Sequence, residues 1–124
     1  MSYVAMVTSR FDEVTRFYGE LPGFSIVEQW DRAHARGIRF DTGGMRLEII
    51  DNDRERHQLE LGELADKVQI VVEVEDITRV RELIKVEAPP IQDASWGARL
   101  FQVRDPDGVP VTFLQWTGTE DTGP

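Results

Sequence analysis

The sequence predicts a single α+β domain made of two modules, each with the element order strand, helix and three strands. Short runs of alternating apolar and polar residues recur in both halves, and this is the period of half-buried strands. One stretch with apolar residues at helical spacing follows the first strand of each half. The clearest strand pair spans residues 96–116, on both sides of the turn sequence Asp105-Pro106-Asp107-Gly108. In such a turn proline fixes φ, aspartate bonds the nearby backbone and glycine accepts a positive φ.

The first module is predicted over residues 2–50. A strand over 2–8 precedes a helix that starts near Ser9, where Ser9 and Asp12 approximate a capping box. Pro22-Gly23 ends this helix. Strands follow at 24–30, 37–41 and 45–50, with a polar loop at 31–36.

The second module is predicted over residues 67–116, after a charged surface connector at 51–66. A strand over 67–75 precedes Asp76, which is expected to cap a helix that Pro89-Pro90 terminates. A short strand near Ile91 leads to the hairpin. The polar tail over 117–124 has little to bury, and we expect it to be disordered.

Composition excludes several kinds of function. The 124-residue chain has a formal net charge of −9, which disfavours binding to a phosphate backbone, so no nucleic-acid partner is expected. It contains no cysteine and therefore no thiolate ligand or thiol nucleophile. Neither a signal leader nor a membrane span is recognisable, and a cytoplasmic location without membrane contact is the expectation.

Strand alternation predicts which residues face away from the helices. The helix-covered face of each sheet must be apolar, while the opposite face can be mixed, and two such faces can enclose a cavity. In the strand over 45–50, Leu47 and Ile49 belong under the helix, so Arg46 and Glu48 turn toward the cavity. For the strand over 37–41 both parities stay open: either Arg39 and Asp41, or Ile38 and Phe40, face inward.

Three stretches resemble the signatures of one superfamily. They are FYGELPGF at 17–24, RLEII at 46–50 and WGARLFQVRDPDGVPVTF at 96–113. Together with the duplication, these stretches make the chain similar to members of the glyoxalase, bleomycin-resistance and extradiol-dioxygenase superfamily, which are also called vicinal oxygen chelate proteins. The resemblance implies a glyoxalase-like fold, with paired curved mixed sheets around a cavity and helices on the outer faces.

The resemblance also implies where a metal would bind. Enzymes of this superfamily hold a divalent metal on up to four inward residues, typically His, Glu, His and Glu. The matching positions here are Tyr3, Glu48, Gln69 and Thr112, of which only Glu48 keeps its type. Neutral oxygen atoms around one carboxylate make a poor site for zinc, nickel or iron. We therefore expect no metal ligands and no cofactor, with a divalent metal as the minor alternative.

The chain has two histidines, His34 and His57. Both lie among charged residues in predicted loops, away from the strand positions where ligands are expected. We interpret them as solvated surface residues.

The resemblance then favours the antibiotic-resistance branch, in which a small acidic homodimer binds an aromatic or cationic drug at the subunit interface. Such a site needs aromatic faces and carboxylates. Two alternatives stay open. One is a lyase, isomerase or dioxygenase that uses an atypical metal site, or Glu48 as a catalytic base; the other is an interaction module with a vestigial cavity. The predicted ligand-binding residues are Tyr3, Trp30, Arg39, Phe40, Arg46, Glu48, Gln69, Glu73, Trp96, Arg99, Phe101, Thr112 and Trp116.

Overall fold

The computed structural model describes residues 2–62 and 67–118. The first module contains β1 (Tyr3–Thr8), α1 (Phe11–Gly19), β2 (Ser25–Arg32), β3 (Ala35–Asp41), β4 (Arg46–Asp51) and the short 3₁₀ helix η1 (Asn52–Arg54). The second contains β5 (Ile70–Glu73), α2 (Ile77–Leu83), β6 (Gln92–Ala94), β7 (Ala98–Arg104) and β8 (Pro110–Trp116).

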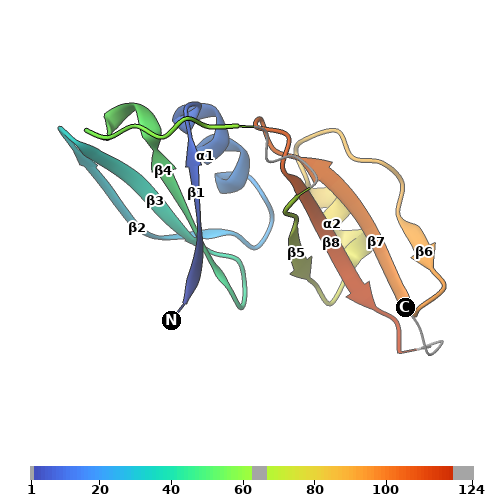
Figure 1. Cartoon of the computed structure of the whole chain (residues 1–124). Helices are drawn as coiled ribbons and strands as arrows, with labels where there is room; N and C mark the ends of the chain where they lie inside the picture. Colours follow the sequence, from blue (N-terminus) through green and yellow to red (C-terminus); the bar gives the residue numbers. More distant parts are fainter. Residues whose placement is uncertain (1, 63–66, 119–124) are drawn as a thin grey trace.

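The two modules have the same topology. Their four-stranded sheets follow the orders β1-β4-β3-β2 and β5-β8-β7-β6. In each sheet the first strand runs parallel to the last, and the other pairs are antiparallel. Figure 1 shows the two modules side by side, each with its helix against one face of its sheet. This arrangement confirms the predicted duplication and the α+β fold.

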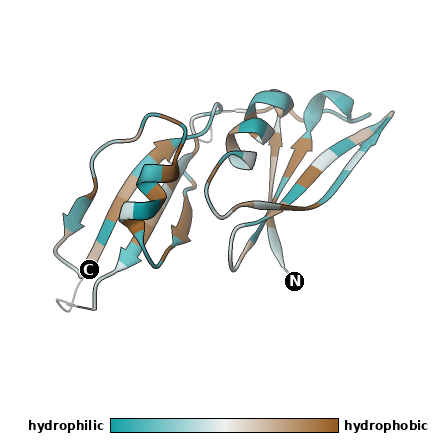
Figure 2. Ribbon diagram, turned by 180° about the vertical axis from the view of Figure 1, so that it is seen from behind, coloured by the Kyte–Doolittle hydropathy of each residue, from teal (hydrophilic) through white to brown (hydrophobic). Residues whose placement is uncertain are grey.

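The core lies between the sheets and their helices. Leu47 and Ile49 of β4 are fully buried there, as alternation predicted, and Val111 and Phe113 of β8 are their counterparts in the second module. Figure 2 shows hydrophobic and hydrophilic residues alternating along the strands. Buried residues of both modules form one continuous hydrophobic cluster, so the modules share a core.

One buried hydrogen bond joins the modules. The Tyr18 hydroxyl of α1 donates to Asp105 Oδ2 in the β7–β8 turn, at 2.7 Å. The other oxygen of Asp105 accepts from the backbone N–H groups of Asp107 and Val109, at 2.8 and 2.9 Å. Burial raises the pKa of the Tyr18 hydroxyl, and the Asp105 carboxylate raises it further. Burial also raises the pKa of Asp105, against the opposing effect of the hydrogen bonds it accepts.

Three local predictions are wrong. Helix α1 starts without a side-chain cap, so Ser9 and Asp12 form no capping box; the Thr8 hydroxyl instead accepts from Arg10 N–H, at 2.9 Å. The predicted loop over 31–36 is mostly strand, because β2 and β3 continue to a tight hairpin. Strand β5 is shorter than the predicted 67–75, and Val68 is exposed.

The N-cap predicted for the second helix is confirmed, because the Asp76 carboxylate accepts from the Arg79 backbone N–H, at 3.1 Å. The predicted end of this helix is wrong, because α2 stops at Leu83, well before Pro89-Pro90. Residues 63–66 of the predicted connector and 119–124 of the predicted disordered tail lie outside the described residues. No helix in the described part of the chain is long and apolar enough to cross a membrane.

Candidate functional site

The face of the first sheet that carries no helix, called here the first open face, presents a row of polar side chains. Cross-strand register aligns Ala5 of β1, Glu48 of β4, Arg39 of β3 and Glu28 of β2. This register settles the parity of β3: Arg39 and Asp41 lie on the open face, while Ile38 and Phe40 pack into the core. Alternation along β4 then places Arg46 and Glu48 on the same open face.

Arg39 forms the centre of this row. Its Nε and Nη2 donate to Glu48 Oε2 at 3.1 and 2.5 Å, and its Nη1 donates to Glu28 Oε1 at 2.9 Å. The Glu48 side chain is only 8% exposed, so a partner is needed to offset the cost of burying its charge. The hydrogen bonds that Arg39 donates to Glu48 raise the pKa of the Arg39 guanidinium. Glu48 is therefore ion-paired.

Two aromatic rings contact the same guanidinium. The Arg39 Cζ lies 4.5 Å from the centre of the Tyr3 ring and 5.6 Å from that of the Trp30 ring. The Trp30 ring fits against Gly37, because a Cβ at Gly37 would come within 2.3 Å of it. Arg39 is thus held by two carboxylates and two cation–π contacts.

The corresponding face of the second sheet, the second open face, carries a neutral hydrogen-bonded chain. Gln102 Nε2 donates to Thr112 Oγ1 at 3.1 Å, and Thr112 Oγ1 donates to Gln69 Oε1 at 2.8 Å. Thr112 is buried, whereas Gln69 and Gln102 are exposed. Thr112 therefore links the two glutamine side chains through its hydroxyl.

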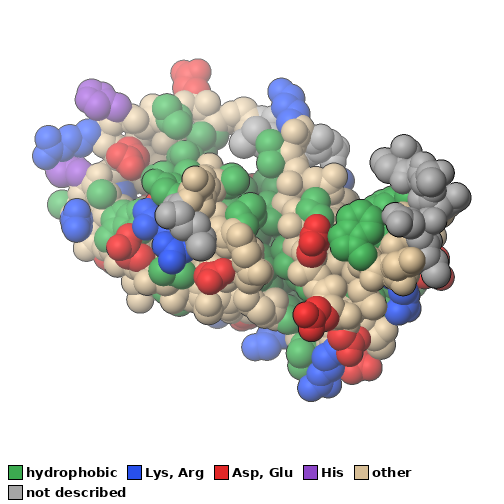
Figure 3. Space-filling model, turned by 90° about the horizontal axis from the view of Figure 1, so that it is seen from below, with side chains coloured by type: hydrophobic (Ala, Val, Ile, Leu, Met, Phe, Trp, Pro, Cys, Tyr) green, Lys and Arg blue, Asp and Glu red, His purple; other side chains and the backbone are tan. Residues whose placement is uncertain are grey.

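Apolar and aromatic side chains surround this neutral chain. Val71 and Trp116 are 45% and 54% exposed, and the Trp116 ring meets the Trp96 ring edge to face at 5.4 Å. Glu73 also belongs to this face and is exposed. Figure 3 views the molecule from the end where β1 begins and β8 ends, and shows hydrophobic side chains exposed on both modules there. In a single chain both open faces are therefore accessible.

Three predicted ligand-binding residues do not lie on these faces. Phe40 and Phe101 are 0% and 1% exposed and belong to the core under the helices. Arg99 pairs in register with Gln115, whose side chain accepts from the Ile77 N–H of α2, so both are on the helix side. The sequence could not separate Phe40 and Phe101 from ligand-binding residues, because aromatic side chains are common both in hydrophobic cores and in ligand sites.

The side chains at the family's metal positions do not fit a divalent metal. Glu48 Oε2 already accepts two hydrogen bonds from Arg39, and Gln69 and Thr112 are bonded to each other. Tyr3 supplies a ring face to Arg39. Among the described residues, no three His, Cys, Asp or Glu side chains are grouped as a metal site. Both histidines are exposed, as predicted.

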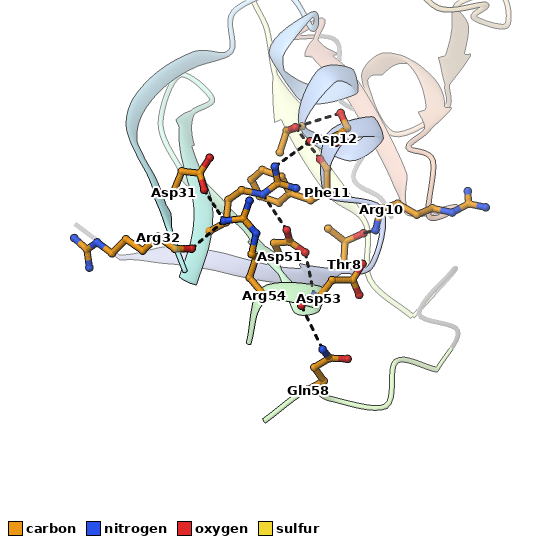
Figure 4. Close-up of polar contacts among 12 residues, drawn as sticks. Thr8, Arg10, Phe11, Asp12, Asp31, Arg32, Asp51, Asp53, Arg54 and Gln58 are labelled. Carbon is orange, nitrogen blue, oxygen red and sulfur yellow. Dashed lines mark hydrogen bonds and ion pairs between the residues drawn. The ribbon is translucent and has the colours of Figure 1, made fainter. Parts of the chain in front are cut away.

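A second polar cluster lies at the start of α1 (Figure 4). Arg36 pairs with Asp51 at 2.9 Å and with Asp12 at 3.3 Å, and its guanidinium lies over the Phe11 ring. Arg54 Nη1 donates hydrogen bonds to Asp31 Oδ1 at 2.5 Å and to the Arg32 carbonyl oxygen at 2.9 Å. Each of these charged groups has a partner: Arg36 joins α1 to β3 and β4, and Arg54 joins η1 to β2.

Two side chains that form hydrogen bonds on the open faces were not among the predicted site residues. Glu28 completes the Arg39 row, and Gln102 starts the neutral chain on the second sheet. The signal for Gln102 was its place in the strand alternation, opposite Thr112. Glu28 could not be paired with Arg39 because β2 contains a register irregularity between Ile26 and Glu28, which sequence alternation does not reveal.

Comparisons with known proteins agree with this geometry. The family model of the Glyoxalase/Bleomycin resistance protein/Dioxygenase superfamily matches residues 1–113. No curated protein sequence matches the chain significantly. The fold resembles a glyoxalase/bleomycin resistance protein/dioxygenase from Nocardioides, with a TM-score of 0.70 and 20% identity over 99% of this chain and 87% of that one.

Two further solved structures are similar. The fosfomycin resistance protein FosX from Listeria monocytogenes has a TM-score of 0.70 and 17% identity over 95% of this chain and 93% of its own, and a mutant of it was solved with Mn(II). Lactoylglutathione lyase from Agrobacterium tumefaciens has a TM-score of 0.65 and 17% identity over 93% and 92%. At such identities the likeness concerns the fold alone.

Proposed function

Because the chain belongs to the Glyoxalase/Bleomycin resistance protein/Dioxygenase superfamily, we propose that it is a metal-independent small-molecule binding protein of the bleomycin-resistance type. It holds an aromatic or cationic compound in a cavity at the interface of a cytoplasmic homodimer. One observation carries this proposal: the carboxylate at the metal position is occupied by Arg39, while aromatic side chains remain accessible on both open faces.

Metal independence is supported by the chemistry of the donor set. A divalent metal at Glu48 would share this carboxylate with a guanidinium that makes two hydrogen bonds to one of its oxygens and whose positive charge repels the metal. The remaining candidates, Tyr3, Gln69 and Thr112, offer neutral oxygen atoms. The same ion pair weakens the alternative in which Glu48 acts as a catalytic base, since the base would need to be free to accept a substrate proton.

An aromatic ligand is supported by the accessible ring surfaces. Tyr3 and Trp116 are each about half exposed, and Trp96 contacts Trp116. Aromatic pairs add about 0.5–1.5 kcal/mol beyond the area they bury. A cationic ligand has less support, because Arg39 already fills the position between Tyr3 and Trp30 that a ligand cation would take.

A homodimer is supported by the open faces. One chain leaves Val71 and Trp116 partly exposed to water, and a second copy would cover them and enclose a ligand. Light scattering on the purified protein should give twice the mass of one chain. A monomer at micromolar concentration would contradict this part of the proposal.

The ligand proposal is tested by NMR titration of ¹⁵N-labelled protein in excess EDTA. The probes are 2-naphthamide and (2-naphthylmethyl)ammonium, and the readout is the indole N–H signals of the three tryptophans, assigned with single Trp→Phe variants. We expect the signals of Trp30 and Trp116 to shift saturably without any added metal. Leu83→Ala, on the outer surface of α2, serves as a control that should not change the titration.

The competing functions predict different outcomes of the same titration. Consumption of a probe, abolished in Glu48→Gln, would indicate an enzyme that uses Glu48 as a base. Shifts that appear only after a divalent metal is added would indicate an atypical metal site. If neither probe shifts any indole signal at millimolar concentration, the binding proposal is wrong and an interaction module with a vestigial cavity becomes the better account.

A further inference from the structure

Arg46 is a cation on the first open face without a partner in the described part of the chain. Its Nε is buried and has no hydrogen-bond partner. Register places Tyr3 of β1 on one side of Arg46 and Asp41 of β3 on the other. Arg39, the other arginine of this face, is instead held by two carboxylates.

One oxygen of each neighbouring carboxylate is already engaged. Asp41 Oδ1 accepts from the Gly43 backbone N–H at 2.8 Å, which turns this carboxylate toward the β3–β4 connection. Glu48 Oε2 accepts both of its hydrogen bonds from Arg39. A buried donor without an acceptor carries a free-energy cost, and a movement of the Arg46 side chain toward a ligand acceptor would remove this cost.

We propose that Arg46 recognises a carboxylate on the aromatic ligand. This inference rests on the proposed function and names the ligand class more closely: a flat aromatic acid, whose ring contacts Tyr3 while its carboxylate accepts from the Arg46 guanidinium. The planar guanidinium matches a carboxylate with two parallel hydrogen bonds.

The acidic character of the protein opposes an anionic ligand at long range. A formal net charge of −9 repels anions at long range. At physiological salt this repulsion is screened beyond about 8 Å. Recognition of an anion therefore has to come from a short-range contact, and Arg46 is placed to make it.

The test compares 2-naphthoate with its neutral analogue 2-naphthamide in the same NMR titration. We expect the wild-type protein to bind 2-naphthoate about tenfold more tightly, which equals about 1.4 kcal/mol. Arg46→Gln should reduce this ratio of dissociation constants to about one. Arg46→Lys, which keeps the charge but not the planar fork, should retain part of the preference. Arg79→Gln removes the same charge from the outer surface of α2 and should leave the ratio unchanged.

The possible failures are distinguishable. If both probes bind the wild-type protein with the same dissociation constant, the assignment to Arg46 is wrong while the binding function stands. The same holds if Arg46→Gln and Arg79→Gln change the ratio of the two dissociation constants to the same extent. If no probe shifts these signals, both are wrong. Unchanged backbone amide spectra of the variants establish that the fold is intact in each comparison.

Discussion

At the scale of single residues, the pairing of Glu48 decides what the first open face can do. A carboxylate that is 8% exposed on a strand surface is stable only with a partner, and Arg39 supplies it from the adjacent strand. Sequence reasoning placed Glu48 on this face. It could not identify the partner of Glu48, because the pairing depends on register between strands.

The Arg39 row predicts an asymmetric response to mutation. Arg39→Met leaves the buried Glu48 carboxylate without its partner, whereas Glu48→Gln leaves Arg39 paired with Glu28. We therefore expect Arg39→Met to lower the thermal midpoint more than Glu48→Gln does. The double variant should be more stable than Arg39→Met alone, because it removes the orphaned charge. Equal midpoints for the two single variants would contradict this account of the row.

The Tyr18–Asp105 bond predicts a loss of stability in alkali. The pKa of Tyr18 is raised in the folded protein, so above the usual tyrosine pKa of 10.0 only the unfolded state releases this proton. The free energy of unfolding attributable to Tyr18 therefore falls as pH rises beyond this value.

Tyr18→Phe should abolish this part of the alkaline loss. At neutral pH the variant should be less stable by about 1.5–3 kcal/mol, because a hydrogen bond to a charged group is lost. Urea unfolding at several pH values checks both effects. If wild type and Tyr18→Phe lose stability in parallel above pH 10, the buried hydroxyl is not responsible.

At the scale of elements, alternation predicted the strand faces well. Leu47 and Ile49 are buried as expected, because the period of a strand fixes which side chains share a face. Element ends were harder, since they depend on hydrogen bonds that short motifs do not determine. The two predicted caps illustrate this: Asp76 caps α2, while Ser9 makes no cap.

The two predicted caps allow a matched comparison of stability. Asp76→Ala removes the bond to the Arg79 N–H and should destabilise the protein by about 1 kcal/mol. Ser9→Ala removes a hydroxyl with no capping role and should change stability by less than about 0.5 kcal/mol. Thermal unfolding of the two variants beside wild type measures this difference. A larger loss for Ser9→Ala would show that the serine does cap α1.

At the scale of the whole molecule, duplication was predictable because both halves repeat one order of elements. The arrangement of the modules was not, since it depends on contacts such as Tyr18 with Asp105, which are 87 residues apart. The sequence predicted paired sheets around a cavity, whereas each open face of a single chain is accessible. The cavity therefore needs a second chain in the proposed homodimer.

Metal binding tests the central claim most directly. Untagged protein, purified without chelator, is analysed for bound metal and then titrated with Mn²⁺, Ni²⁺, Zn²⁺ and Fe²⁺ in a thermal-shift assay beside Glu48→Ala. We predict less than stoichiometric metal and no stabilisation that depends on Glu48. A metal at 100 times its dissociation constant would stabilise the folded state by about 2.7 kcal/mol. About one metal per chain, with stabilisation lost in Glu48→Ala, would contradict metal-independent binding.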